Sequence, residues 1–153
     1  MICAYDRIYL EAGRRNLARM LDFAVYDMHY ELQQFYNWFL ISGIAEQFGE
    51  GDYRFLAGMS GVELAYEVLD ASQIVYERRK PCYSADRSEE YWTGWALAYY
   101  QWETSLTFRE IEKYIPRYPP AASCRGAGGL SSRCRRGRRG GRLPQKKGSS
   151  GRP

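Results

Sequence analysis

The stretch SEEYWTGWALAYYQWE, residues 88–103, is the segment that decides the fold. Its large aromatic residues recur every three or four positions, so on a helix they share one broad face: Tyr91, Trp92, Trp95, Tyr99 and Trp102. Gly94 and Ala98 are four residues apart, which allows a neighbouring helix to approach closely. An aromatic stripe with this spacing usually belongs to a core, and the alternative is the lining of a ligand pocket. We therefore expect a largely buried aromatic helix.

The segments that precede this helix also have apolar residues at helical spacing. The pattern predicts an amphipathic helix from Asp6, as N-cap, to about Met28. A second helix is expected from about Glu31 to Ile41, and residues 44–48 are expected to add one or two turns. Gly49 to Asp52 has the composition of a turn.

Two capping boxes mark further helix starts, because Ser or Thr and the Glu three residues later each bond the backbone amide of the other. Ser60 and Glu63 form one box, and Thr107 and Glu110 form the second, which opens a short helix with Ile111 and Ile115 directed inward. Residues 77–87 are polar and predict a connecting loop. No repeat or strand pattern stands out, so we predict an all-α, compact bundle of about five helices.

The charges are segregated along the 153-residue chain. Residues 1–116 contain 11 basic and 18 acidic residues, a net charge of −7, whereas residues 117–153 contain 11 basic residues and no acidic one. Of the 24 aromatic residues only Tyr118 lies beyond position 117. We predict an acidic helical domain over 1–116 and a disordered, Arg/Gly-rich basic tail over 117–153, which lacks the apolar residues needed to offset the entropy of ordering.

The tail admits two explanations. The first is an arm that binds RNA or DNA phosphates with strong salt dependence, through six arginines within residues 133–142: Arg133, Arg135, Arg136, Arg138, Arg139 and Arg142. It has no aromatic residue after Tyr118 for base stacking. The second is a frameshift, because Arg, Gly, Ala, Pro, Ser and Cys are what GC-rich DNA encodes in a non-selected frame, and the composition changes abruptly after Pro116.

Sequence motifs for catalysis are weak. His29 is the single histidine and stands between Tyr26 and Tyr30, where a structural or exposed role is the usual one. The segment 58–62 differs from a nucleophile elbow at Val62 and follows no predicted strand, so Ser60 is better explained as a helix cap. We expect no cofactor and no enzymatic activity; an enzyme built on His29 and the aromatic face is the least favoured hypothesis.

Cysteine usage and hydropathy suggest a compartment. The four cysteines form no CxxC pair, so neither a zinc site nor a disulfide framework is expected. The N-terminus lacks the apolar run of a secretory signal, and no stretch has the ~20 apolar residues of a membrane span. We therefore expect a cytoplasmic protein without metal or membrane partners.

Four stretches resemble a group of small, uncharacterised proteins from gut Firmicutes and their mobile elements: residues 5–12, 42–48, 57–65 and 91–102. Genes of this group look like companions of small toxin-like genes, including ones that resemble ADP-ribosyltransferases. By analogy the resemblance implies an antitoxin or another protein that binds and restrains a partner, such as the product of an adjacent gene. Similar proteins continue with an acidic helix after Tyr118-Pro119, and this chain departs from them there, which favours the frameshift.

These observations lead to a non-enzymatic protein–protein interaction module as the expected function, with nucleic-acid binding through the tail as the alternative. The net charge of −7 would steer encounter with a basic partner. The expected contact residues are acids and aromatics near the helix junctions: Glu50, Asp52, Tyr53 and Tyr83.

Overall fold

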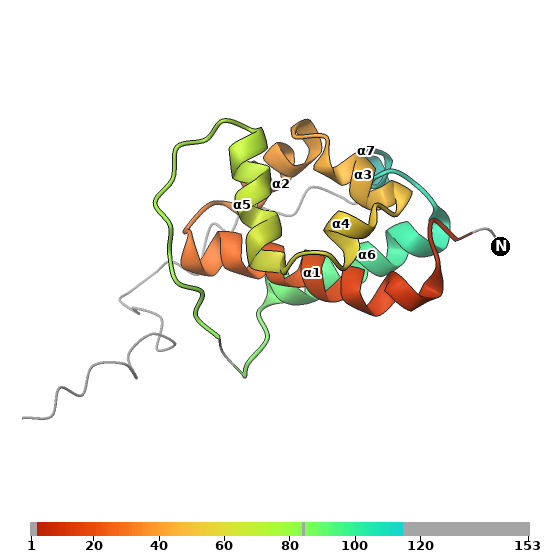
Figure 1. Ribbon diagram of the computed structural model, residues 1–153, viewed down its shortest axis with the longest axis horizontal. Coiled ribbons are helices and arrows are strands. Elements are labelled where there is room, and N and C mark those ends of the chain that lie inside the picture. Colours follow the sequence, from red (N-terminus) through yellow and green to blue (C-terminus); the bar gives the residue numbers. More distant parts are fainter. Residues whose placement is uncertain (1–2, 84, 115–153) are drawn as a thin grey trace, which may run out of the picture.

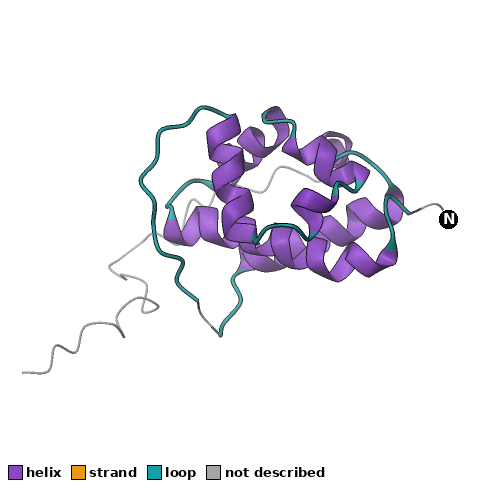
Figure 2. Cartoon of the chain, viewed as in Figure 1, coloured by secondary structure: helices purple, strands orange, loops and turns teal. Residues whose placement is uncertain are grey.

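The computed structural model describes residues 3–83 and 85–114, and these form helices and loops without a strand (Figure 2). The all-α prediction is confirmed. The elements, in chain order, are η1 (Arg7–Tyr9), α1 (Leu10–Asp22), the π-helical η2 (Phe23–Asp27), α2 (Leu32–Ile41), α3 (Ile44–Glu50), α4 (Tyr53–Leu56), α5 (Gly61–Ala71), α6 (Glu89–Thr104) and α7 (Phe108–Tyr114). The predicted disorder and frameshift of residues 117–153, and the inward placement of Ile115, lie outside the described residues.

Helix α1 is the central helix of the fold, and most of the other helices pack against it (Figure 1). Helix α6 runs along one side of α1, and α4 and α5 pack against it elsewhere. Helices α2 and α3 follow each other along the chain and pack together, and α7 rests on α3. The described part contains seven α-helices, compared with the about five that the sequence predicted. The difference arises because α3 is a helix separate from α2, and because the four-residue α4 has no sequence pattern of its own.

The core is built from aliphatic side chains of α1 and α5 and from phenylalanines of the other helices. Leu17, Met20 and Leu21 of α1 are almost fully buried, as are Leu64, Val68 and Leu69 of α5. The ring of Phe108 in α7 meets Phe39 of α2 and Phe48 of α3 edge-on, with ring centroids 5.3 and 5.8 Å apart. These edge-on contacts, a favoured geometry for aromatic pairs, connect three helices.

Both predicted capping boxes are present. At α5, the Glu63 amide donates to Ser60 Oγ over 3.3 Å and the Ser60 amide donates to Glu63 Oε2 over 2.7 Å. At α7, the Glu110 amide donates to Thr107 Oγ1 over 3.2 Å and the Thr107 amide donates to Glu110 Oε2 over 2.9 Å. These amide hydrogen bonds hold the pKa of both Glu63 and Glu110 below its usual range.

The α1–α6 pair is close because Gly94 has no side chain. A Cβ atom at Gly94 would lie 2.7 Å from Ala18 Cα and 2.8 Å from the Leu17 carbonyl oxygen. Both of these atoms are backbone atoms, so no side-chain rotation could relieve the overlap. The predicted close approach of a neighbouring helix is confirmed at Gly94, and Ala98 is fully buried.

We expect Gly94→Ala to lower the free energy of unfolding by about 1–3 kcal/mol, the usual cost of overpacking, although alanine favours a helix over glycine by about 1 kcal/mol. Gly49→Ala in α3 is the matched control, because its new Cβ would meet only the amide end of Gln101, at 3.2 Å. Urea denaturation measures both variants. A Gly94→Ala protein as stable as the natural one would contradict the close approach.

We expect the stabilising effect of Glu63 to depend on pH. Its folded pKa is lowered, so its contribution is present above the unfolded pKa and is lost as the pH falls through the folded value. The difference in unfolding free energy between the natural protein and Glu63→Gln should be below about 1 kcal/mol at neutral pH, because the carboxylate is exposed. The difference should shrink in acid, and a difference independent of pH would argue against the capping role.

Candidate interaction surface

The orientation of α6 follows from its small residues. Ser88 caps the helix by accepting a hydrogen bond from the Tyr91 amide over 3.0 Å, and its hydroxyl donates to Asp22 at the end of α1. Gly94 faces the backbone of α1, and Leu97 and Ala98 are buried. Because these small residues occupy the helix–helix contact, most of the large rings of α6 are placed on its other sides.

The outer side of α6 carries a group of exposed aromatic residues that we call the α6 aromatic surface: Trp92, Tyr99, Tyr100 and, from α7, Tyr114. Trp92 is 55% exposed and Tyr114 72%. The expectation of a largely buried aromatic stripe is therefore wrong for α6: Tyr91 is buried at 5% exposure, but Trp92 and Tyr99 are exposed and Trp95 and Trp102 are half-buried. The close approach at Gly94 and Ala98 leaves no room for those rings.

A shallow pocket of about 390 Å³ opens between α6 and α7. Its lining combines the small side chains of Thr93 and Ala96 with the rings of Tyr100 and Tyr114. Leu97 forms the remaining part of the lining. An apolar pocket lined in part by two tyrosines suits an apolar side chain of a partner.

The rings on the other flank of α6 are held in place by contacts with the N-terminal part of the protein. The Arg14 guanidinium of α1 lies 4.1 Å from the Trp95 ring centroid and 5.0 Å from that of Tyr99. The Trp102 indole N–H donates to the Tyr5 carbonyl over 2.8 Å. Fixed rings lose little entropy on binding, which favours their use in recognition.

The four predicted contact residues are all exposed, but they divide between two places. Glu50, Asp52 and Tyr53 lie at the junction of α3 and α4, where the Asp52 side chain caps α4 and the Tyr53 ring stands edge-on to Tyr9, with centroids 6.0 Å apart. Tyr83 lies in the α5–α6 loop, 4.6 Å below the Arg19 guanidinium. Tyr9, the N-cap of α1, and Arg19 within α1 are ten residues apart, a rise of about 15 Å on a helix. The predicted residues therefore do not form one patch.

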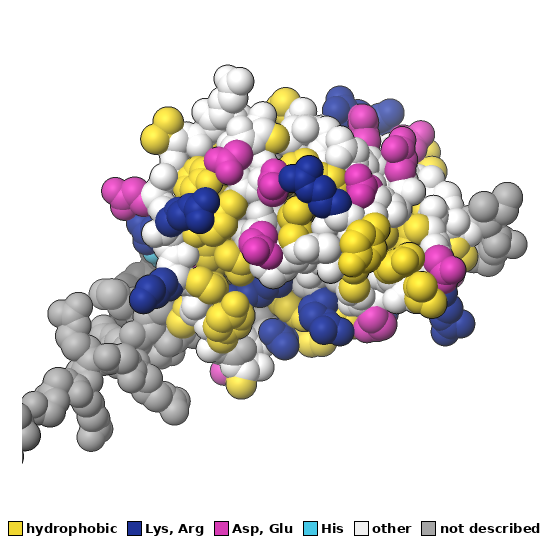
Figure 3. All heavy atoms as spheres, viewed as in Figure 1, with side chains coloured by type: hydrophobic (Ala, Val, Ile, Leu, Met, Phe, Trp, Pro, Cys, Tyr) yellow, Lys and Arg dark blue, Asp and Glu magenta, His cyan; other side chains and the backbone are white. Residues whose placement is uncertain are grey.

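Figure 3 shows, on the face that includes α4 and α5, that acidic, basic and apolar side chains are interspersed. No continuous patch of one sign appears on that face. The α6 aromatic surface, which sequence reasoning assigned to the core, concentrates large apolar residues more than the α3–α4 junction does. One feature of the sequence could have indicated this surface: a helix contact made through Gly94 and Ala98 is too narrow to bury all the large rings of α6.

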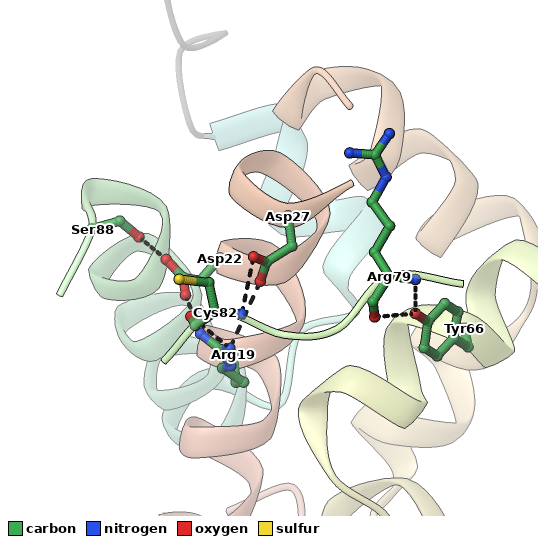
Figure 4. A network of polar contacts seen from close by, with 7 residues as sticks. All are labelled: Arg19, Asp22, Asp27, Tyr66, Arg79, Cys82 and Ser88. Carbon is green, nitrogen blue, oxygen red and sulfur yellow. Dashed lines mark hydrogen bonds and ion pairs between the residues drawn. The ribbon is translucent and has the colours of Figure 1, made fainter. Parts of the chain in front are cut away.

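The long loop between α5 and α6, residues 72–88, is attached to the body by side chain to backbone hydrogen bonds (Figure 4). The Tyr66 hydroxyl accepts from the Arg79 amide over 3.0 Å and donates to the Arg79 carbonyl over 2.9 Å. Arg19 donates to the Cys82 carbonyl over 3.2 Å, and the Cys82 amide donates to Asp27 over 3.1 Å. At each of the two attachment points, the backbone amide and the backbone carbonyl of one loop residue, Arg79 or Cys82, are both hydrogen-bonded to side chains of the body.

The second attachment contains a cluster of charged side chains with little exposure. Arg19 forms ion pairs with Asp22 and Asp27, and Asp22 also accepts from the Ser88 hydroxyl. Burial raises the pKa of Asp27 above its usual range, against the lowering effects of the Cys82 amide and Arg19. The buried carboxylates depend on Arg19, because removal of one partner from such a pair is strongly destabilising.

We expect Tyr66→Phe to release the middle of the loop while leaving the ring in the core. Trypsin cleavage after the exposed Arg78 and Arg79 should accelerate about fivefold, equivalent to about 1 kcal/mol of lost hydrogen bonding. Tyr36→Phe is the matched control, because it removes a hydroxyl that bonds the Phe108 carbonyl elsewhere in the fold. Equal cleavage of both variants would mean that the Tyr66 hydroxyl does not hold the loop.

The described residues contain no group of three or more His, Cys, Asp or Glu side chains that could hold a metal ion. His29 is exposed in a left-handed backbone conformation, with φ of 63°, and Ser60 acts as a helix cap. Cys3 is a free thiol. The six candidate nucleic-acid-binding arginines of residues 133–142 lie outside the described residues.

The chain matches no family model, no curated protein and no solved structure. Among the helices described, none combines the length and the apolar character needed to cross a membrane.

Proposed function

We propose that the protein is a non-enzymatic interaction module that binds a partner protein through the α6 aromatic surface. The observation that carries the proposal is the exposure of Trp92, Tyr99, Tyr100 and Tyr114 beside a shallow apolar pocket. Tryptophan and tyrosine dominate the energetics of protein interfaces, because they bury a large area at a low cost in side-chain entropy.

The charge of the surface suggests the chemistry of the partner. Helix α6 carries Glu89, Glu90 and Glu103 and no lysine or arginine. A basic partner with apolar side chains for the pocket complements both features. The resemblance to companions of toxin-like genes favours the product of an adjacent gene as that partner, which this protein would restrain as an antitoxin does.

We expect Trp92→Ala and Tyr100→Ala each to weaken binding of the co-expressed adjacent-gene product by about tenfold or more. Both side chains are exposed, so neither change creates a cavity. Ile41→Ala, at a 74% exposed position of α2, should leave the affinity within about threefold of the natural value. Affinity is measured by calorimetry on the purified full-length chains.

Tyr53→Ala separates the two surfaces, because Tyr53 is 61% exposed at the α3–α4 junction. If Tyr53→Ala alone weakens the complex, the interface lies at that junction and the α6 proposal fails. If the adjacent-gene product does not bind the natural protein, the antitoxin-like role fails.

Nucleic-acid binding by residues 117–153 is the second candidate, favoured by 11 basic residues without an acidic one. In that case replacement of Arg133, Arg135, Arg136, Arg138, Arg139 and Arg142 by glutamine would remove RNA and DNA binding together with its salt dependence. Trp92→Ala would leave it unchanged. The two functions are therefore separated by the same set of proteins.

A further inference from the structure

The α6 aromatic surface and the C-terminal segment of the same chain have complementary chemistry. Helix α6 carries Glu89 and Glu103 and no lysine or arginine, and residues 117–153 carry 11 positive charges and no negative one. Opposite charges of this size attract each other over about 10 Å at moderate salt. The nearest abundant basic partner for α6 is therefore part of its own chain.

Helix α6 already binds arginine side chains through its rings. Arg14 lies 4.1 Å from the Trp95 ring centroid, and Arg87 lies 4.4 Å from that of Tyr91. Within the described part of the chain, no arginine is seen over Trp92 or Tyr100. A guanidinium group stacks well on such exposed rings, because it is planar and weakly hydrated.

The connection between surface and segment is short. Tyr114 lines the pocket, and the chain continues from it into residues 115–153. Arg117, the first basic residue of the segment 117–153, lies three residues after Tyr114 and within about 10 Å of it along the backbone. A tether of this kind gives an effective concentration of the order of millimolar, so even weak contacts would be populated.

We propose that the basic segment 117–153 binds the α6 aromatic surface of its own chain. Its arginines stack on Trp92 and Tyr100, and Glu89 and Glu103 balance their charge. Binding of the segment deepens the proposed function and rests on it in one respect, because both use the α6 aromatic surface as a docking site. A partner at the surface then competes with the segment.

Paramagnetic relaxation tests the proposal on the full-length chain, because Cys134 lies within the arginine-rich stretch. A nitroxide is attached to Cys134 after Cys3, Cys82 and Cys124 are replaced by serine, and indole N–H signals are recorded with the nitroxide oxidised and reduced. Trp92 and Trp95 report on α6, and Trp38 of α2, which packs against Tyr30 and Phe35, is the internal control.

We expect the Trp92 and Trp95 signals to lose at least about half of their intensity at about 50 mM salt while Trp38 keeps its own, and to recover at about 0.5 M salt. Replacing the six arginines of residues 133–142 by glutamine should also restore them. Attenuation that survives both changes would come from the tether alone and would overturn the proposal, as would full intensity at low salt.

A mixture of isotope-labelled chains without nitroxide and unlabelled chains with nitroxide separates binding in the same chain from binding to a second copy. Attenuation in the mixture as strong as in the single chain would overturn the intramolecular assignment. The result of the partner experiment is independent of this one. If Trp92→Ala leaves partner binding intact, and the Trp92 signal of the nitroxide-labelled chain that keeps Trp92 is still attenuated, only the proposed function falls. If Trp92→Ala weakens the partner complex but no attenuation occurs, only the present inference falls.

Discussion

The rest of the structure depends on the close contact between Gly94 of α6 and the backbone of α1 at Leu17 and Ala18. A Cβ atom at Gly94 would lie 2.7 Å from Ala18 Cα. Helix α1 has a second contact of the same kind, because a Cβ at Gly61 of α5 would lie 2.5 Å from the Asn16 carbonyl oxygen. Two neighbours thus approach α1 through glycine, and α1 forms the centre of a small fold.

The same constraint produces the exposed rings. A helix packed through glycine and alanine offers its neighbour a narrow contact, so its larger side chains must lie beside that contact or away from it. On the flank of α6 near α1, the Trp95 ring contacts Arg14 and the Trp102 indole N–H donates to the Tyr5 carbonyl. Trp92 and Tyr100 lie away from that flank and remain exposed, together with Tyr114 and part of the Tyr99 ring. Elsewhere large exposed residues such as Ile41 and Val75 stand apart in the sequence and need no explanation.

Local signals in the sequence predicted the local structure. The predicted caps Asp6, Ser60 and Thr107 all cap helices, because a cap depends only on residues within one turn. The sequence could not show which side of α6 faces the core, since the aromatic stripe and the Gly94–Ala98 pair both had the spacing of a buried face. The attachment of the α5–α6 loop was also invisible, because Arg19 and Cys82 are 63 residues apart in the sequence. Helix α4 was missed because four residues carry no periodicity.

Competition between a tethered segment and a partner has a quantitative consequence. If the segment binds α6 with a millimolar dissociation constant and its effective concentration is also about millimolar, about half of the molecules have the surface covered. The apparent affinity for a partner then falls only about twofold. Such a segment tunes the availability of the surface and does not block it. Because the attraction is between exposed charges, salt weakens it, whereas the apolar contacts of a partner with Trp92 and the pocket persist. Ionic strength therefore shifts the balance toward the partner wherever that partner binds mainly through apolar contacts.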